Sequence, residues 1–388
     1  MNMKKFMKKF AAVSMAVVMT VAFAGCGNDS GTNTGDGAAK FVIGGIGPTT
    51  GDAAVYGQGV KNAAEMAVEE INANGGINGY QVEFLWQDDT EKAVNAYNSL
   101  KDQGMQMLMG TVTSAPCTAV VALTEEDNMF QLTPSGSAVE SIKGDNAFRV
   151  CFSDPNQGVG SADYFAENFP NAKVGVVYNS SDVYSNGIFK TFKKEAAAKG
   201  VNVVATEAFT KDSAQDFTVQ IQKMKESGAD LVFLPFYAQE ASLFLTQADK
   251  AGLDAQFFGC DGLDGLIKQL GSNAQLAEGV MLLTPYAADS DNEASKKFTE
   301  AYEAKYDGEV PTQFAADAYD AMYIIKKAAE TAGVTPDMSV SDICDAMKKA
   351  MTEIEFTGAT GTMTWSADGE PTKTPMAMVI KNGEYKSL

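Results

Sequence analysis

Short runs of β-branched and aromatic residues alternate with longer amphipathic stretches from residue 40 onward. Phe41–Ile43 is typical of a strand, and Gly57–Ala73 places its apolar residues on one face of a helix. Such alternation predicts parallel sheets covered by helices on both faces. The alternation starts afresh after Asp154, so two sheets are expected. The predicted strands are 41–43, 82–86, 105–109, 129–132 and 148–152, then 173–178, 201–205, 231–236 and 256–259.

We therefore predict an α/β fold of two doubly wound, Rossmann-like lobes. A chain of 388 residues exceeds the size at which one core usually divides. The first lobe is expected to comprise 40–151 with 285–360, and the second 152–284 with 361–388. The chain would then cross from one lobe to the other three times, and these three crossings would form the hinge. Gly361–Trp365 and Ala377–Ile380 predict a terminal β-hairpin.

The first 39 residues have the layout of a secretory signal. A head with four lysines precedes the uncharged run Phe10–Ala24, which is shorter than the roughly 20 residues of a membrane span. The small residues before Cys26 resemble a bacterial lipobox, although Phe23 replaces the usual leucine. We expect a signal peptide at 1–25, a lipid on Cys26 and a flexible tether over 26–39. The alternative is an ordinary signal peptide with an incidental cysteine.

Composition excludes several functions. The formal net charge of −20 argues against nucleic acid and against docking on anionic lipid, so the lipid anchor is the only expected membrane contact. The chain has no histidine, which removes the commonest general base and transition-metal ligand. We predict neither an enzyme nor a cofactor or metal site. An extracellular hydrolase would need a lysine or carboxylate pair, and no suitable spacing is present.

Four cysteines remain besides Cys26, namely Cys117, Cys151, Cys260 and Cys344. They are far apart and form no CxxC pair, which argues against a zinc or redox centre. Two disulfides are possible in an exported protein, with three connectivities. Buried free thiols are the alternative that we expect, because a chain of this size needs no disulfide bonds to be stable.

Ligands of doubly wound sheets bind outside the carboxyl ends of the strands, so the loops there were compared. Gly44–Gly51 resembles a dinucleotide loop only superficially, because Pro48 stiffens it and no GxGxxG is present. The loop around Val112, Thr113 and Ser114 offers hydroxyls and free N–H groups at a helix N-terminus, which suits an anion. Plain N-capping by Ser114 is the alternative.

A second hydroxyl-rich turn, Thr133–Ser137, follows the next predicted strand and includes Ser135 and Ser137. The corresponding loops of the second series carry Tyr184, Tyr237 and Asp261 instead. One lobe thus offers donors for an anion, and the other offers tyrosines and a carboxylate. A zwitterion would satisfy both. Surface positions for the tyrosines, a plain turn at Ser137 and a capping function for Asp261 are the alternatives.

The residues after 40 resemble the leucine/isoleucine/valine-binding type of extracytoplasmic solute-binding protein that serves ABC importers. This resemblance covers the rest of the chain and implies the type I periplasmic-binding-protein architecture. The matching motifs are Ile46–Gly51, Tyr56-Gly57, Ala67–Asn72, Gly75–Gly79, Gln87–Asp89, Leu132–Pro134, Ala248–Leu253 and Gly361–Trp365.

The resemblance implies a function for each candidate residue. Ser114, Ser137 and neighbouring N–H groups, at Val112 and Thr113 among others, would hold an α-carboxylate. The Ser135 carbonyl and Asp261 would hold the ammonium. The branched-chain binders usually have glutamate at the latter position, so the shorter Asp261 leaves room or needs a water.

The remaining candidates enclose the ligand. Tyr184 and Tyr237 would close over it, while Tyr56 and Phe314 would line the pocket of its side chain. The resemblance implies a monomeric, membrane-tethered component that captures a small amino acid, most readily a branched-chain one, and delivers it to an ABC permease. An amide or aromatic acid as ligand, or a sensor that reports to a membrane receptor, remains open.

Overall fold

The computed structural model describes residues 39–90 and 92–388. The predicted signal peptide over 1–25, the lipid site at Cys26 and all but the last residue of the 26–39 tether lie outside these residues. Residues 39–388 form one compact unit. The predicted two-sheet α/β fold is confirmed within it.

The first sheet is parallel throughout and has the order β2-β1-β3-β4-β5. Each crossover returns the chain to the same edge, so the carboxyl ends of all five strands lie together. The strands are β1 (Phe41–Ile46), β2 (Val82–Gln87), β3 (Met107–Gly110), β4 (Gln131–Thr133) and β5 (Ala147–Arg149).

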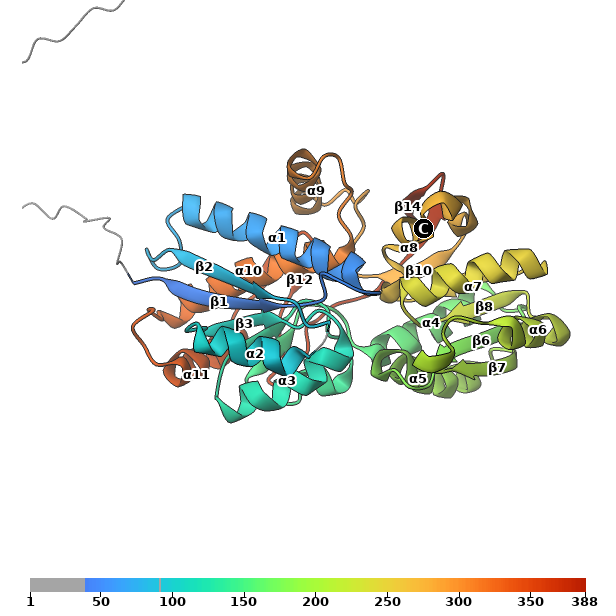
Figure 1. Ribbon diagram of the computed structural model, residues 1–388, viewed down its shortest axis with the longest axis horizontal. Helices are drawn as coiled ribbons and strands as arrows, with labels where there is room; N and C mark the ends of the chain where they lie inside the picture. The colour runs from blue at the N-terminus through green and yellow to red at the C-terminus, as the bar shows by residue number, and fades with distance from the viewer. Residues whose placement is uncertain (1–38, 91) are drawn as a thin grey trace, which may run out of the picture. The chain divides into compact units, whose positions relative to one another are not determined.

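Helices cover both faces of this sheet. Helices α1 and α10 pack against each other on one face, and α2 and α3 lie on the other (Figure 1). Helix α1 ends at Ala73 because Gly75 and Gly76 follow in left-handed conformations that favour glycine. The helices of this region are α1 (Ala54–Ala73), α2 (Ala93–Asp102), α3 (Ser114–Glu126), α9 (Glu293–Lys305), α10 (Gln313–Ala332) and α11 (Val340–Met351).

The second sheet has the order β14-β13-β10-β9-β8-β6-β7. Its strands from β10 to β7 are parallel, whereas β13 joins β10, and β14 joins β13, in antiparallel pairs. The strands are β6 (Val174–Asn179), β7 (Val203–Phe209), β8 (Leu231–Leu234), β9 (Gln256–Gly259), β10 (Met281–Thr284), β13 (Met376–Lys381) and β14 (Glu384–Ser387).

Residues along β8 alternate between two buried clusters. Leu231 and Phe233 join the cluster under α4 and α5, whereas Val232 and Leu234 join the one under α6 and α7. This two-residue period buries both faces of the central strands. Short 3₁₀ turns complete the connections. The helices here are α4 (Asp154–Asn168), α5 (Val183–Lys199), α6 (Thr218–Ser227), α7 (Ala238–Ala251) and α8 (Leu266–Leu270).

Two expectations about the second half of the chain need correction. The predicted hairpin between Gly361–Trp365 and Ala377–Ile380 is wrong, because β12 (Gly361–Met363) pairs with β11 (Phe356–Gly358). Strand β13 pairs instead with β10 and β14. Helix α4 was not foreseen, since its sequence DPNQGVGSADYFAEN has few apolar residues at helical spacing.

The four cysteines of the described region, Cys117, Cys151, Cys260 and Cys344, are buried free thiols. Within residues 39–90 and 92–388, no helix combines the length and apolar character that a membrane span requires.

Candidate functional site

Two hydroxyl groups meet at the carboxyl edge of the first sheet. Ser114 begins α3 directly after the β3 loop, and Ser137 follows β4. Their Oγ atoms are 3.4 Å apart, and both residues are 1% exposed. Ser114 Oγ accepts a hydrogen bond from Ala138 N at 3.1 Å and caps no helical N–H group. The N-capping alternative for Ser114 is therefore wrong, since Thr113 occupies the cap position.

Hydrogen bonds between side-chain hydroxyls and the backbone fix the turn that carries these serines. Ser135 Oγ donates to the carbonyl of Val112 at 2.7 Å, which ties the β4 turn to the β3 loop. Gly136 N donates to Thr133 Oγ1 at 2.8 Å. Thr113 is half-buried beside them. The four predicted loop residues Val112, Thr113, Ser114 and Ser135 thus lie together with Ser137, as a set of hydroxyls and amides.

Tyr184 and Asp261 form a buried hydrogen-bonded pair in the second sheet's loops. Tyr184 OH donates to Asp261 Oδ1 at 2.7 Å and accepts from Gly262 N at 2.9 Å. The ring of Tyr237 stacks on that of Tyr184, with centroids 4.6 Å apart and planes 16° apart. Because Tyr184 is 1% exposed, the surface alternative for it is wrong.

Burial sets the protonation of Asp261. Asp261 is 3% exposed, and this desolvation raises its pKa to about 7 despite the hydrogen bond from Tyr184 that lowers it. Asp261 lies in a short 3₁₀ turn, Asp261–Leu263, whose cap is Cys260 without a side-chain bond. Its carboxylate therefore bonds to Tyr184 rather than serving as the predicted alternative cap.

Asp154 is a candidate that the sequence did not indicate. It begins α4, immediately after the chain leaves the first sheet, and its N–H donates to the carbonyl of Ser137 at 2.9 Å. It is 1% exposed, and neither carboxylate oxygen has a hydrogen-bond partner among the described residues. Burial raises its pKa well above the usual range, and the nearby charge of Asp261 adds to this effect. Such a group is suited to a cationic ligand.

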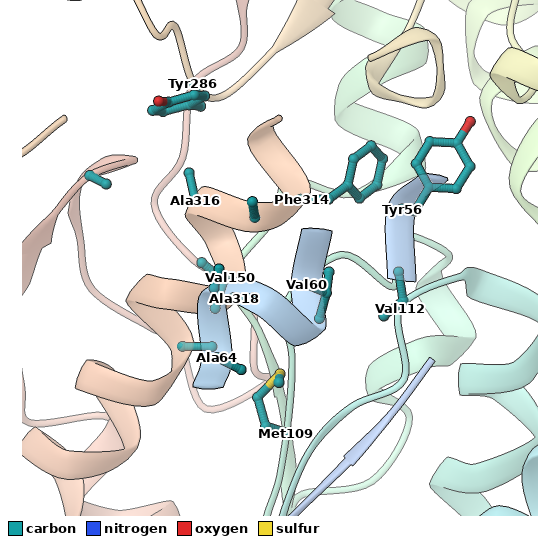
Figure 2. Packing of buried hydrophobic residues seen from close by; sticks show 14 of the residues in the cluster. Tyr56, Val60, Ala64, Met109, Val112, Val150, Tyr286, Phe314, Ala316 and Ala318 are labelled. Carbon is teal, nitrogen blue, oxygen red and sulfur yellow. The ribbon is translucent and has the colours of Figure 1, made fainter. Parts of the chain in front are cut away.

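Aromatic side chains lie beside these polar groups. Figure 2 shows Tyr56 and Phe314 next to each other near the beginnings of α1 and α10, and their ring centroids are 4.5 Å apart. Tyr237 lies 5.6 Å from Tyr56 by the same measure. Tyr56 OH donates to the carbonyl of Gly262 at 2.6 Å and accepts from Ala238 N at 2.8 Å. Tyr56 thus connects α1 to two loops of the second sheet.

Gln313 makes a second connection that sequence analysis missed. Its backbone N–H donates to Asp264 Oδ2 at 2.6 Å, and its Nε2 donates to the carbonyl of Asp261 at 2.8 Å. Its position beside the predicted Phe314, at the start of α10, was the only available sequence signal.

A separate cavity of about 460 Å³ lies nearby, and none of the ten predicted ligand residues lines it. Val55, Asp264, Tyr286 and Tyr385 are among its lining residues. The unpartnered carboxylate of Asp154 and the serine hydroxyls near it favour the serine loops over this cavity as the candidate site. The loops combine anion donors, carboxylates and aromatic rings, which together suit a small zwitterion with an apolar side chain.

Two doubly wound sheets with complementary groups at their facing loops define a two-lobed ligand-binding protein. The chain matches the family described as periplasmic binding protein over residues 40–384, and it belongs to this family.

Relatives of the chain are named for amino acids. The Leu/Ile/Val-binding protein homolog 3 of Brucella melitensis is 31% identical over 341 residues, covering 86% of this chain and 89% of that protein. The leucine-, isoleucine-, valine-, threonine-, and alanine-binding protein of Pseudomonas aeruginosa is 31% identical over 303 residues, which cover 76% of this chain and 79% of that protein. These relatives are binding proteins and not enzymes.

A solved structure extends the comparison. The branched-chain amino acid transporter substrate-binding protein LivJ of Streptococcus pneumoniae, in complex with isoleucine, has a TM-score of 0.81 and 28% identity. The match covers 90% of this chain and 98% of that one. The fold predicted from the sequence, a type I periplasmic-binding-protein architecture, is confirmed.

Proposed function

We propose that this protein is the substrate-binding component of an ABC importer and captures a branched-chain amino acid between its two lobes. The observation that carries the proposal is the burial of Ser114 and Ser137, with Asp154 bonded to the same turn, and of Asp261 in the other lobe. Each charge of a zwitterion needs several hydrogen bonds when it is buried; the serine hydroxyls can donate to a carboxylate, and the aspartates can accept from an ammonium. The names of the relatives support the amino-acid class.

The ten predicted residues then have distinct functions. Ser114 and Ser137, with backbone N–H groups near Val112 and Thr113, would hold the carboxylate. Asp261 and the carbonyl of Ser135 would hold the ammonium, and Asp154 would be a second carboxylate beside it. Tyr184 and Tyr237 would close over the ligand. Tyr56 and Phe314 would contact its apolar side chain.

Closure of the lobes is the mechanism that we infer. The ligand would dock on the serine loops, and hinge closure would bring Tyr184, Tyr237 and Asp261 onto it. Only contacts that are better in the closed form drive this step. We propose lobes of 40–151 with 285–360 and of 152–284 with 361–388. The contact of Trp365 with Arg149 favours a somewhat later third crossing.

The cellular setting is also part of the proposal. Lipid on Cys26 would anchor a monomeric protein to the outer face of the cytoplasmic membrane, with 1–25 removed and 26–39 as tether. The permease partner would receive the amino acid there.

Thermal melting of purified protein, freed of ligand by unfolding and refolding, tests the function. Leucine, isoleucine or valine should raise the melting temperature, whereas the corresponding keto acids, which lack the ammonium, should not. A shift with aromatic acids or amides alone would contradict the amino-acid class. A ligand-bound protein that engages a receptor but no permease would indicate a sensor.

A further inference from the structure

Arg149 is the only arginine among the 388 residues of the chain. It ends β5, just before the chain leaves the first sheet, and its side chain is 0% exposed. A buried guanidinium has lost its hydration, so its contacts must compensate for that loss. The contacts of Arg149 connect the serine turn to the segment of the third crossing.

The first contact determines the direction of a peptide group. Arg149 Nη1 donates to the carbonyl of Gly136 at 3.0 Å, and Gly136 lies between Ser135 and Ser137. In a planar trans peptide, the carbonyl of one residue and the N–H of the next point in opposite directions. By fixing the Gly136 carbonyl, Arg149 therefore fixes the N–H of Ser137. That N–H makes no hydrogen bond to another described residue.

The other side of the same turn is closely packed. Gly136 N is bonded to Thr133 Oγ1, and a Cβ atom at Gly136 would lie only 2.9 Å from Cys117 Sγ. Ser135 Oγ is held by the carbonyl of Val112. The turn is thus confined between this packed side and the guanidinium of Arg149, which leaves the peptide little freedom to rotate.

Further contacts of Arg149 come from residues 365–370. Its N–H donates to the carbonyl of Gly369 at 3.2 Å, and Trp365 Nε1 donates to its carbonyl at 2.7 Å. Glu370 Oε1 lies 3.1 Å from Nη2 in an ion pair. Gly369 has φ +78°, and a Cβ there would lie 2.2 Å from the carbonyl oxygen of Ala147, so this approach requires glycine. The crossing segment is therefore held against the end of β5.

We propose that Arg149 is a positioning residue that orients the turn Thr133–Ser137 for a ligand carboxylate and couples this turn to the segment 365–370. The inference rests on the proposed function, because it takes Ser137 as a carboxylate contact. Its charge lies behind the turn and is weakly screened, so it favours a carboxylate over a neutral group at the same place. The ligands that depend on Arg149 are small molecules with a free carboxylate.

The test compares two ligands on two variants of the full-length protein by calorimetric titration. L-leucinamide keeps the ammonium and side chain of L-leucine but replaces the carboxylate with a neutral amide. Arg149→Gln removes the charge behind the turn. Lys373→Gln is the matched control, because Lys373 is a buried cation of the same crossing, paired with Asp317 at 2.7 Å, and has no contact with the turn.

Arg149→Gln should lower the preference for leucine over leucinamide by about tenfold, the usual size of one hydrogen bond to a charged group. Lys373→Gln should leave this preference within about twofold of wild type. Arg149→Lys keeps the positive charge but lacks the planar guanidinium group, so it should give an intermediate preference. If the glutamine variant does not fold, the lysine variant provides the same comparison.

Equal losses for both ligands in the Arg149 variants would show a merely structural function and overturn the inference. The inference would also be overturned if Lys373→Gln changed the preference for leucine over leucinamide as much as Arg149→Gln does. A wild-type protein that binds neither leucine nor leucinamide would refute the proposed function, and this inference with it. A wild-type protein that binds leucine, with an unchanged preference in Arg149→Gln, would refute the inference alone.

Discussion

Tyr56 provides the sharpest test of how the two lobes are held together. Its hydroxyl donates to the carbonyl of Gly262 at 2.6 Å and accepts from Ala238 N at 2.8 Å, so one oxygen atom bonds to two loops of the other lobe. Tyr56→Phe removes that atom and keeps the ring contacts with Phe314 and Tyr237. When the lobes separate, water can bond to Gly262 and Ala238, so the loss weakens only the closed form.

The magnitude follows from these two bonds. Each contributes about 1 kcal/mol net, and leaving a carbonyl and an N–H group unpaired at a dry interface adds to the loss. We expect the closed form to be destabilised by about 2–3 kcal/mol, which corresponds to roughly 30- to 150-fold weaker ligand binding. Calorimetric titration with leucine measures this change directly.

Tyr97→Phe is the matched control. Tyr97 is 0% exposed, and its hydroxyl donates to Asp127 Oδ2 at 2.8 Å within the first lobe. This variant should lower the free energy of unfolding by about 1 kcal/mol and leave the affinity unchanged. A Tyr56→Phe protein that binds leucine within twofold of wild type would refute the conclusion that the Tyr56 hydroxyl stabilises the closed form.

Three further predictions concern the site and the crossing. Asp261→Ala should weaken amino-acid binding by about 3–5 kcal/mol in titrations, because an ammonium would be buried without its partner; unchanged affinity would remove Asp261 from the site. Since burial raises the pKa of Asp261 to about 7 and an ammonium requires the ionised form, affinity should fall about tenfold from pH 8 to pH 6. In the ligand-free protein the same pKa shift should make the free energy of unfolding decrease as the pH rises from about 4 to about 7, because the folded state retains the proton to higher pH than the unfolded state. An affinity and a stability that are both independent of pH would contradict the raised pKa of Asp261. Gly369→Ala should lower the free energy of unfolding by about 1–3 kcal/mol in denaturant titrations, whereas Gly383→Ala, also at positive φ but in open space, should cost less.

Much of the fold follows from local sequence patterns. The strand Gln256–Gly259 has the bounds that the sequence pattern predicts. Such patterns succeed because a buried strand and an amphipathic helix each show their period within a few residues. The rule that ligands bind at the carboxyl ends of parallel strands then selected the loops that carry Ser114, Ser137 and Asp261.

Other features depend on pairing between distant segments. Local sequence does not determine which strand lies beside β13, so the terminal hairpin was predicted wrongly. Asp154 and Arg149 show no motif, and their importance comes from burial and from partners far along the chain. The raised pKa of Asp261 has the same origin, since its desolvation arises only when the folded chain buries the carboxyl group. The sequence by itself therefore determined the elements and the kinds of group available, whereas the tertiary structure decided which groups meet and how strongly each is desolvated.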